Sequence, residues 1–207
     1  MKFYQYVTIA FLTMGLATNA MAQDNTDNAN NEEVSKYDGG TFTITPPKNW
    51  LLVSGNLDPK DVAKLPDNVK DHYTQRNTDV IFMDISSPDA DAKGFKDSLN
   101  IVTINEPIPL NADLVKELTN VLKQQYDSMF EKFEFETIEV AERNGQNVLS
   151  VKGSYTVLNH KVNMEQTLIP AKKESLVLTC TYETSKENAD AVIEACRKSV
   201  DSLVLSE

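Results

Sequence analysis

The sequence predicts an α+β fold, an antiparallel β-sheet of about six to seven strands flanked by two main helices. Two observations lead to it. Short segments with alternating apolar residues are joined by connections too short for repeated crossovers between parallel strands. Two other segments carry apolar residues at helical spacing, one between the groups of strands and one at the end. Each helix should therefore cover the sheet with its apolar stripe.

The chain opens with the pattern of a secretory signal peptide over residues 1–22. Lys2 gives a basic start, an apolar run spans residues 7–16, and Ala20-Met21-Ala22 provides a cleavage site before Gln23. The apolar run is too short to cross a bilayer comfortably, so we expect no membrane anchor here. This segment predicts a periplasmic or secreted protein.

Residues 23–36 are predicted to be a disordered acidic leader, because apolar side chains are too few there to offset the entropy of ordering. A single domain is expected over residues 37–207, since the length suits one core and the 41% hydrophobic content is ordinary. Within it, residues 56–77 are polar and locally helical, and we interpret them as an exposed insertion.

The charge of the chain argues against two classes of partner. Removing the signal, whose only charge is Lys2, leaves 19 basic and 31 acidic residues and a net charge of −12. Such a surface repels phosphate groups, so nucleic-acid binding and adsorption to anionic lipid are both disfavoured. The partners expected are neutral, basic or apolar, although negative charge also serves solubility alone.

The first half of the domain should hold four strands and one long helix. The expected strands, each marked by alternation or by flanking turn residues, are 41–44, 50–53, 80–85 and 101–104. The strongest helix is expected over residues 112–132, with Asn111 as its N-cap. Its apolar stripe, interpreted as core, consists of Leu114, Val115, Leu118, Val121, Leu122, Met129 and Phe130.

The second half should hold a meander of about four strands and a final helix. The expected strands are 135–142, 146–157, 161–169 and 176–182. Asn144-Gly145 marks the first hairpin because both residues tolerate positive φ, and Gly153 is a candidate bulge. Thr184-x-x-Glu187 has the pattern of a capping box that opens a helix over 186–201. That helix should fold back on the sheet.

Cys180 and Cys196 are the only cysteines. Cys180 alternates with Leu178 and Tyr182, and Cys196 shares a helical face with Ile193 and Val200, so both thiols should point into one interior. An oxidising compartment would let them form a disulfide, and two buried thiols are the alternative. The absence of Cys-x-x-Cys argues against a redox role. Neither cysteine follows the signal, so lipid attachment is not expected.

We expect no catalytic, cofactor or metal site from the motifs present. His72 lies in the polar insertion and His160 in an expected hairpin turn, and both are interpreted as surface residues. Cysteine and histidine do not occur at zinc-ligand spacing. Asp89-x-Asp91 is only weakly similar to a calcium loop, because Lys93 stands at the third ligand position and Asn100 where a carboxylate belongs.

Paired carboxylates for glycosidic chemistry are the remaining catalytic candidate. The residues concerned are Glu131, Glu134, Glu136 and Glu139. They alternate with apolar residues as the solvent face of a half-buried strand does, and no aromatic-rich cleft motif accompanies them. We therefore expect a protein that is not an enzyme.

Residues 42–50, Phe-Thr-Ile-Thr-Pro-Pro-Lys-Asn-Trp, combine a short strand, two prolines and a tryptophan. Followed by the long helix from Ala112, the meander through Tyr182 and the final helix ending in residues 199–203, this order resembles the PsbP-like superfamily. That superfamily includes the exported bacterial DcrB family and the Ran-binding Mog-type proteins. The resemblance covers residues 37–205. It implies a PsbP-like sandwich used mainly as a non-catalytic adaptor, assembly factor or binding module.

These observations favour an exported binding or accessory module that acts on another envelope protein or peptide. Two alternatives stay open: a carrier of a small molecule or cation, and a hydrolase of unrecognised type. Trp50 is the candidate for a partner surface, although a core anchor that pins the opening loop is the preferred interpretation. No cofactor is expected.

Overall fold

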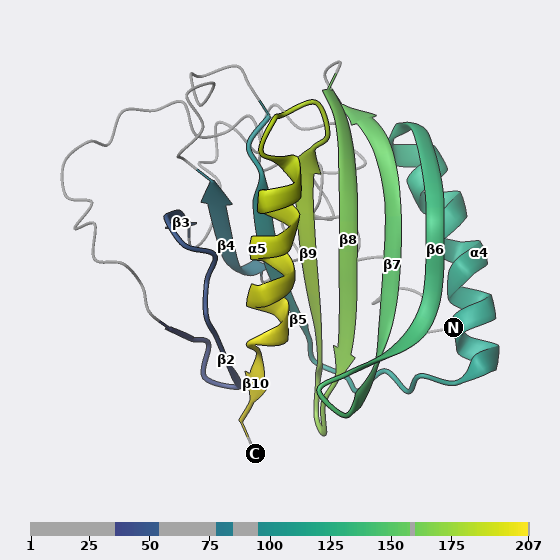
Figure 1. Cartoon of the computed structure of the whole chain (residues 1–207). Coiled ribbons are helices and arrows are strands. Elements are labelled where there is room, and N and C mark those ends of the chain that lie inside the picture. Colours follow the sequence, from purple (N-terminus) through teal and green to yellow (C-terminus); the bar gives the residue numbers. More distant parts are fainter. Residues whose placement is uncertain (1–35, 54–77, 85–94, 158–159, 207) are drawn as a thin grey trace, which may run out of the picture.

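The computed structural model describes residues 36–53, 78–84, 95–157 and 160–206. The expected signal peptide, the polar insertion over 56–77 and all of the expected leader except Lys36 lie outside these residues. The described part consists of two helices and two sheets. Figure 1 shows the larger sheet in the middle. The fold is therefore α+β, as the sequence predicts.

The larger sheet has seven strands in the order β3-β4-β5-β9-β8-β7-β6, and each neighbouring pair is antiparallel. Its strands are β3 (Trp50–Val53), β4 (Thr78–Asp84), β5 (Ser98–Ile104), β6 (Glu131–Arg143), β7 (Gln146–Val157), β8 (His160–Pro170) and β9 (Ser175–Glu183). Strands β6 to β9 form the expected meander. Pairing of β5 with β9 joins the meander to the strands that precede the first helix.

The smaller sheet brings the two ends of the described chain together. It consists of β1 (Tyr37–Asp38), β2 (Phe42–Ile44) and β10 (Val204–Leu205). Strand β2 lies between the other two and is antiparallel to both. Strand β10 was absent from the sequence-based expectation, because two residues are too few to show an alternating pattern.

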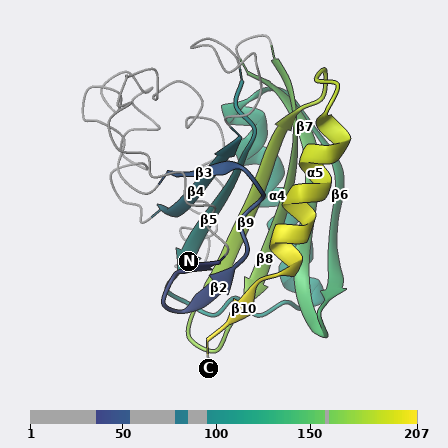
Figure 2. The same ribbon diagram turned by 60° about the vertical axis from the view of Figure 1, so that its left-hand side comes forward.

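The two helices cover opposite faces of the larger sheet (Figures 1 and 2). Helix α4 (Ala112–Met129) lies on one face, and α5 (Ala189–Asp201) lies on the other beside the smaller sheet. Each face has its own buried cluster, because alternate residues of a strand point to opposite sides. Among the described residues, neither helix combines the length and the apolar character that crossing a membrane requires.

The cluster under α4, here called the α4-side core, includes Leu114, Leu118, Leu122, Tyr126, Val102, Leu149, Val151, Leu168 and Val177. The cluster under α5, the α5-side core, includes Phe42, Ile44, Phe82, Leu99, Ile101, Leu176, Leu178, Ile193 and Val200. Strand β9 serves both, since Val177 belongs to the first cluster while its two neighbours belong to the second. The sheet is thus buried on both faces.

Helix α4 begins as expected and ends earlier. The Asn111 side chain accepts a hydrogen bond from the Leu114 N–H at 2.9 Å, as an N-cap does. The helix ends at Met129 instead of residue 132, because Glu131 already pairs with Thr156 as a strand residue. Tyr126, which the expected stripe omitted, is completely buried and fills the last turn of that stripe.

Helix α5 begins at Ala189, three residues later than expected. The capping box predicted at Thr184 is wrong, because the Thr184 hydroxyl donates to the Lys161 carbonyl at 3.3 Å and the N-cap position belongs to Asn188. Asn188 takes the N-cap position without a side-chain capping bond. Contacts with the neighbouring strand therefore override the local capping pattern.

A disulfide joins Cys180 of β9 to Cys196 of α5. Their Cα atoms are 6.2 Å apart, and both residues are buried in the α5-side core. The last helix thus folds back on the sheet and brings the two sulfur atoms together, as the face alternation of the sequence predicts. Both described cysteines are used in this bond.

Candidate functional site

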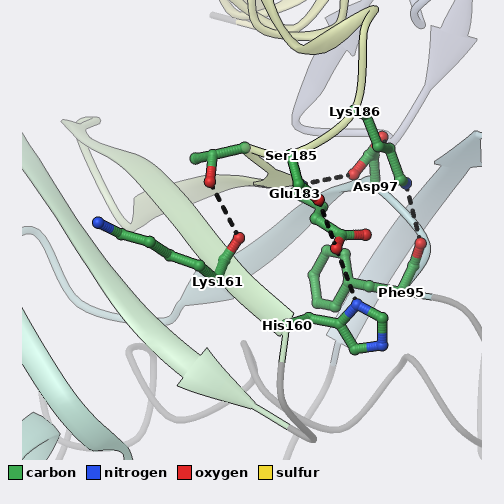
Figure 3. A network of polar contacts seen from close by, with 8 residues as sticks. Phe95, Asp97, His160, Lys161, Glu183, Ser185 and Lys186 are labelled. Atoms are coloured by element: carbon green, nitrogen blue, oxygen red, sulfur yellow. Dashed lines mark hydrogen bonds and ion pairs between the residues drawn. The ribbon is translucent and has the colours of Figure 1, made fainter.

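Titratable side chains gather where β5 and β8 begin and β9 ends (Figure 3). Register brings these places together, because Ser98 pairs with Thr181 and Val162 pairs with Glu183 across the antiparallel strands. We call the group the strand-end network, and its members are Asp97, His160, Glu183, Ser185 and Lys186.

The centre of the strand-end network is the carboxylate of Asp97, only 1% exposed. One of its oxygens accepts the Glu183 N–H at 2.9 Å, and the other lies 3.0 Å from the Lys186 Nζ. The same ammonium donates to the Phe95 carbonyl at 2.9 Å. Burial raises the pKa of Asp97 above its ordinary value, although the Glu183 N–H and Lys186 both favour the ionised form. All these groups are therefore engaged in joining β5 to the end of β9.

The outer part of the network is built on Glu183. His160 Nδ1 lies 2.8 Å from Glu183 Oε1, and the Ser185 hydroxyl donates to the same oxygen at 2.8 Å. Burial alone would raise the pKa of Glu183, but the hydrogen bonds from His160 and Ser185 outweigh it and lower the pKa. The His160 ring also lies beside Phe95, with 6.4 Å between ring centroids.

The order of these groups differs from that of a nucleophilic site. A serine nucleophile needs an imidazole within hydrogen-bond reach to accept its proton. Here Glu183 stands between Ser185 and His160, so the hydroxyl proton points to a carboxylate of lowered pKa, which is a weak base. The geometry instead suits a structural role, in which these hydrogen bonds hold the ends of β5, β8 and β9 together.

The structure corrects the interpretation of His160 as a surface residue in a turn. It is the first residue of β8, its side chain is 29% exposed, and its ring is hydrogen-bonded to Glu183. The prediction had placed residues 158–160 together in the turn. His72, the other candidate, lies outside the described residues.

A second polar group lies inside the α4-side face of the sheet. Asn100, Thr179 and Gln166 stand opposite one another on β5, β9 and β8, and each is 1% exposed. We call these three residues the amide row. The Gln166 Nε2 donates to the Thr179 hydroxyl at 2.8 Å. In the next row, the hydroxyls of Ser98 and Thr181 are 2.9 Å apart.

The amide row was missed at the level of sequence. Asn100 was considered only as a poor calcium ligand, and no role was assigned to Gln166. The structure instead buries Asn100 on β5, in register with Ile81 on β4 and Thr179 on β9. Among the described residues no group of His, Cys, Asp or Glu is arranged to hold a metal ion. Asp89 and Asp91 lie outside them.

Trp50 lies on β3, at one end of the strand order. Its side chain is half-buried and packs against the α5-side core. Its backbone N–H donates to the Pro47 carbonyl at 3.2 Å. Asn49, just before it, adopts a φ of 64°, which fixes the tight turn after the two prolines. This placement fits a core anchor, and the role of Trp50 in a partner surface stays a prediction.

The opposite end of the strand order is formed by β6, which among the described strands pairs with β7 alone. Its exposed side chains include Glu134, Glu136, Glu139 and Glu142, and Val140 is 42% exposed. We call residues 134–142 of this strand the acidic edge. The glutamates point along an open strand and do not converge on a cleft, which is not the arrangement that glycosidic hydrolysis requires.

No protein-family model matches this sequence, and no curated protein is significantly similar. The solved structures give a likeness in fold. PsbP of Synechocystis sp. PCC 6803 (CyanoP) is 11% identical, has a TM-score of 0.53, and aligns over 88% of this chain and 100% of its own. The fold is PsbP-like. The resemblance drawn from the order of elements is thereby confirmed for the fold, while membership of the DcrB family stays a prediction.

Two other solved structures are more distant. LpqN of Mycobacterium tuberculosis, described as involved in cell envelope biogenesis, is 12% identical with a TM-score of 0.45 over 80% of this chain and 83% of its own. Protein PA94 of Pseudomonas aeruginosa, of unknown function, is 13% identical and has a TM-score of 0.49. It aligns over 69% of this chain and 90% of its own. Scores below 0.5 carry no argument here, so the PsbP-like fold rests on the cyanobacterial protein.

Proposed function

We propose that this protein is an exported, non-catalytic binding module whose partner is an extended basic segment of another envelope protein or peptide. The observation that carries the proposal is the acidic edge of β6. Export rests on the signal-peptide pattern at residues 1–22, and the absence of catalysis rests on the way the strand-end network is engaged in structural bonds.

The backbone of β6 offers the means of binding. A strand with one neighbour keeps N–H and C=O groups on its free side that can pair with an added strand. Pairing with β7 is irregular near Glu134 and Phe135, and it is regular from Thr137 to Arg143. The regular stretch is the part that can accept a partner strand in continuous register.

The side chains of the acidic edge decide which strand is accepted. Glu139 and Glu142 are exposed on the regular stretch, with the apolar Val140 between them. Like charges placed opposite each other destabilise strand pairing, so the glutamates oppose pairing of two copies through this edge. Lysine or arginine opposite them is favourable. The edge therefore excludes self-association and favours a basic segment with an apolar residue in its middle.

The test is a crosslinking pull-down from the native envelope fraction. We expect the wild-type chain to recover one reproducible protein that contains an extended basic segment, and the variant Glu139→Lys/Glu142→Lys to lose it by tenfold or more, about 1.4 kcal/mol. The matched control Glu117→Lys/Glu187→Lys has the same change in net charge at two exposed sites away from the edge.

Two results would contradict the proposal. One is an unpartnered monomer in the native fraction. The other is equal recovery by the edge variant and the control, which would show that net charge alone attracts the partner. Because binding is electrostatic in part, recovery by the wild type should also fall as salt is raised.

A further inference from the structure

A row of apolar side chains crosses the larger sheet on its α4 side and reaches the surface at β6. The strand registers place its members directly opposite one another, in the order Val102, Val177, Leu168, Leu149 and Val140. The first four belong to the α4-side core and are at most 5% exposed, whereas Val140 is 42% exposed. The apolar row is therefore covered on β5, β9, β8 and β7, and it is open on β6.

A row on the α5 side of the sheet ends on β6 with a different chemistry. Glu139 stands opposite Ser150, and Ser150 stands opposite Thr167. The two hydroxyl residues are buried, and Glu139 is exposed. Successive residues of a strand point to opposite faces, so Glu139 presents a carboxylate on one face of β6 and Val140 an apolar group on the other. The acidic edge is thus two-sided.

We propose that the partner segment adds to β6 as a further strand of alternating chemistry, in a register set by Val140. This inference rests on the proposed function and specifies how the partner is recognised. An apolar residue opposite Val140 extends the apolar row by one strand and covers the exposed side chain. The next residue of the partner, opposite Glu139, points to the other face and is lysine or arginine. Side chains directly opposite each other interact, so each position contributes separately.

Two further residues of β6 lengthen the pattern. Ile138 lies opposite Val151 and packs against the α4-side core, so a second apolar residue suits its position. Glu142 is exposed, so a second basic residue suits its position. Read along β6 from residue 138, the partner has apolar, basic, apolar, any and basic residues. A shift by one residue would place lysine against the apolar row and an apolar residue against Glu139, so the pattern admits one register.

Two other occupants of this edge lack the required chemistry. A second copy of the chain would bring the glutamates of its own β6, and like charges opposite each other oppose pairing. Residues 23–35 of the same chain contain four acidic residues and no basic one, so they are repelled as well. Charge complementarity therefore favours a basic segment of another protein.

The test compares short synthetic peptides of identical composition on the chain that follows the predicted signal peptide. The core Lys-Thr-Val-Lys-Val has the proposed pattern for antiparallel pairing, and its reverse has the pattern for parallel pairing. In the control core, Val-Thr-Lys-Val-Lys, the valines and lysines are exchanged. Threonines flank each core, and fluorescence polarisation of an attached dye measures binding. We expect one of the two patterned peptides to bind at least tenfold more tightly than the control.

The matched variants are Val140→Ser and Val204→Ser, which change the two large apolar side chains that are exposed among the described residues. The first should weaken binding of the patterned peptide about tenfold, because the contact with the added apolar residue is lost. The second should leave binding unchanged.

The proposal is overturned if neither patterned peptide binds, if the patterned and control peptides bind equally, or if Val140→Ser binds as the wild type does. Its failure is distinguishable from failure of the proposed function. Equal binding of all peptides that is lost in Glu139→Lys/Glu142→Lys would overturn the alternating pattern and leave a basic partner standing. An unpartnered chain in the pull-down would overturn the proposed function without changing the order of peptide affinities.

Discussion

At the scale of single residues, Gly153 of β7 makes room for the irregular pairing of β6. A Cβ atom at this position would lie 2.8 Å from the Glu134 carbonyl oxygen and 2.8 Å from the ring of Phe133. The register of β6 shifts on both sides of Glu134 and Phe135, so that backbone and ring approach β7 closely there. The candidate bulge predicted at Gly153 thus lies in the facing strand, and glycine is what permits it.

We expect Gly153→Ala to destabilise the protein by about 1–3 kcal/mol, because one close contact is with backbone that cannot move aside easily. Urea unfolding measures the change, and Asn147→Ala on the same strand is the control, since its side chain is exposed. Equal stability of the two variants would show that β6 can shift to accommodate a methyl group.

The two carboxylates of the strand-end network should respond to acid in opposite directions. The pKa of Glu183 is lowered in the fold, so its contribution is present above its ordinary pKa of 4.5 and is lost as the pH falls through the folded pKa. The pKa of Asp97 is raised, so the folded state binds its proton first and gains stability as the pH falls toward 3.8.

This reasoning predicts the pH dependence of two variants. Between about pH 6 and about pH 3, the stability advantage of the wild type over Glu183→Gln should shrink, and its advantage over Asp97→Asn should grow. Urea unfolding at each pH measures both differences. Parallel curves for the two variants would contradict the assigned pKa directions.

At the scale of elements, α5 is held to the sheet by a covalent bond and by charged groups. The disulfide fixes Cys196 against β9, and the Arg197 Nε donates to a carboxylate oxygen of Glu165 on β8 at 3.0 Å. The Ser199 hydroxyl donates to the Thr45 carbonyl at 2.6 Å, which links the helix to the segment after β2. The helix thereby joins both sheets.

Removal of the disulfide should lower the free energy of unfolding, because the unfolded chain gains conformational freedom. The bond closes a loop with a sequence separation of 16, for which loop entropy predicts about 3 kcal/mol. We expect Cys180→Ala/Cys196→Ala to lose about that amount in urea unfolding at neutral pH. Dithiothreitol should destabilise the wild type similarly and leave the variant unchanged; a variant as stable as the oxidised wild type would contradict this.

At the scale of the whole molecule, one sheet supports two separate cores. Its alternate side chains enter the α4-side core on one face and the α5-side core on the other, so the loss of either core exposes the same strands. Trp50, the single tryptophan, belongs to the α5-side core. The fluorescence of Trp50 therefore reports a core that α4 does not enter.

In the Leu122→Ala variant, the two cores should still unfold in one transition at a lower urea concentration. Leu122 is fully buried beneath α4, so its truncation should cost about 2–5 kcal/mol. We expect the urea midpoint to shift equally by Trp50 fluorescence and by far-UV circular dichroism, as a two-state transition requires. The exposed neighbour variant Lys123→Ala serves as the control. A shift seen by circular dichroism alone would mean that the two faces unfold independently.

Local patterns account for most of the elements. Alternation located the strands of the meander, and Asn144-Gly145 turns with positive φ at both residues, as expected. The boundaries of α4 and α5 were wrong where a strand or a distant carbonyl competed for residues such as Glu131 and Thr184. These competitors lie in other elements, so no local pattern could register them.

The sequence by itself determined the class of fold, the cysteine pair and the apolar faces, because periodicity in the chain dictates which side chains share a surface. Only the tertiary structure decided which polar residues meet: His160 with Glu183, Asp97 with Lys186, and Asn100 with Thr179 and Gln166. Such contacts depend on the register between strands far apart in the chain. Register is fixed when the two cores pack, and it is not encoded in any one segment.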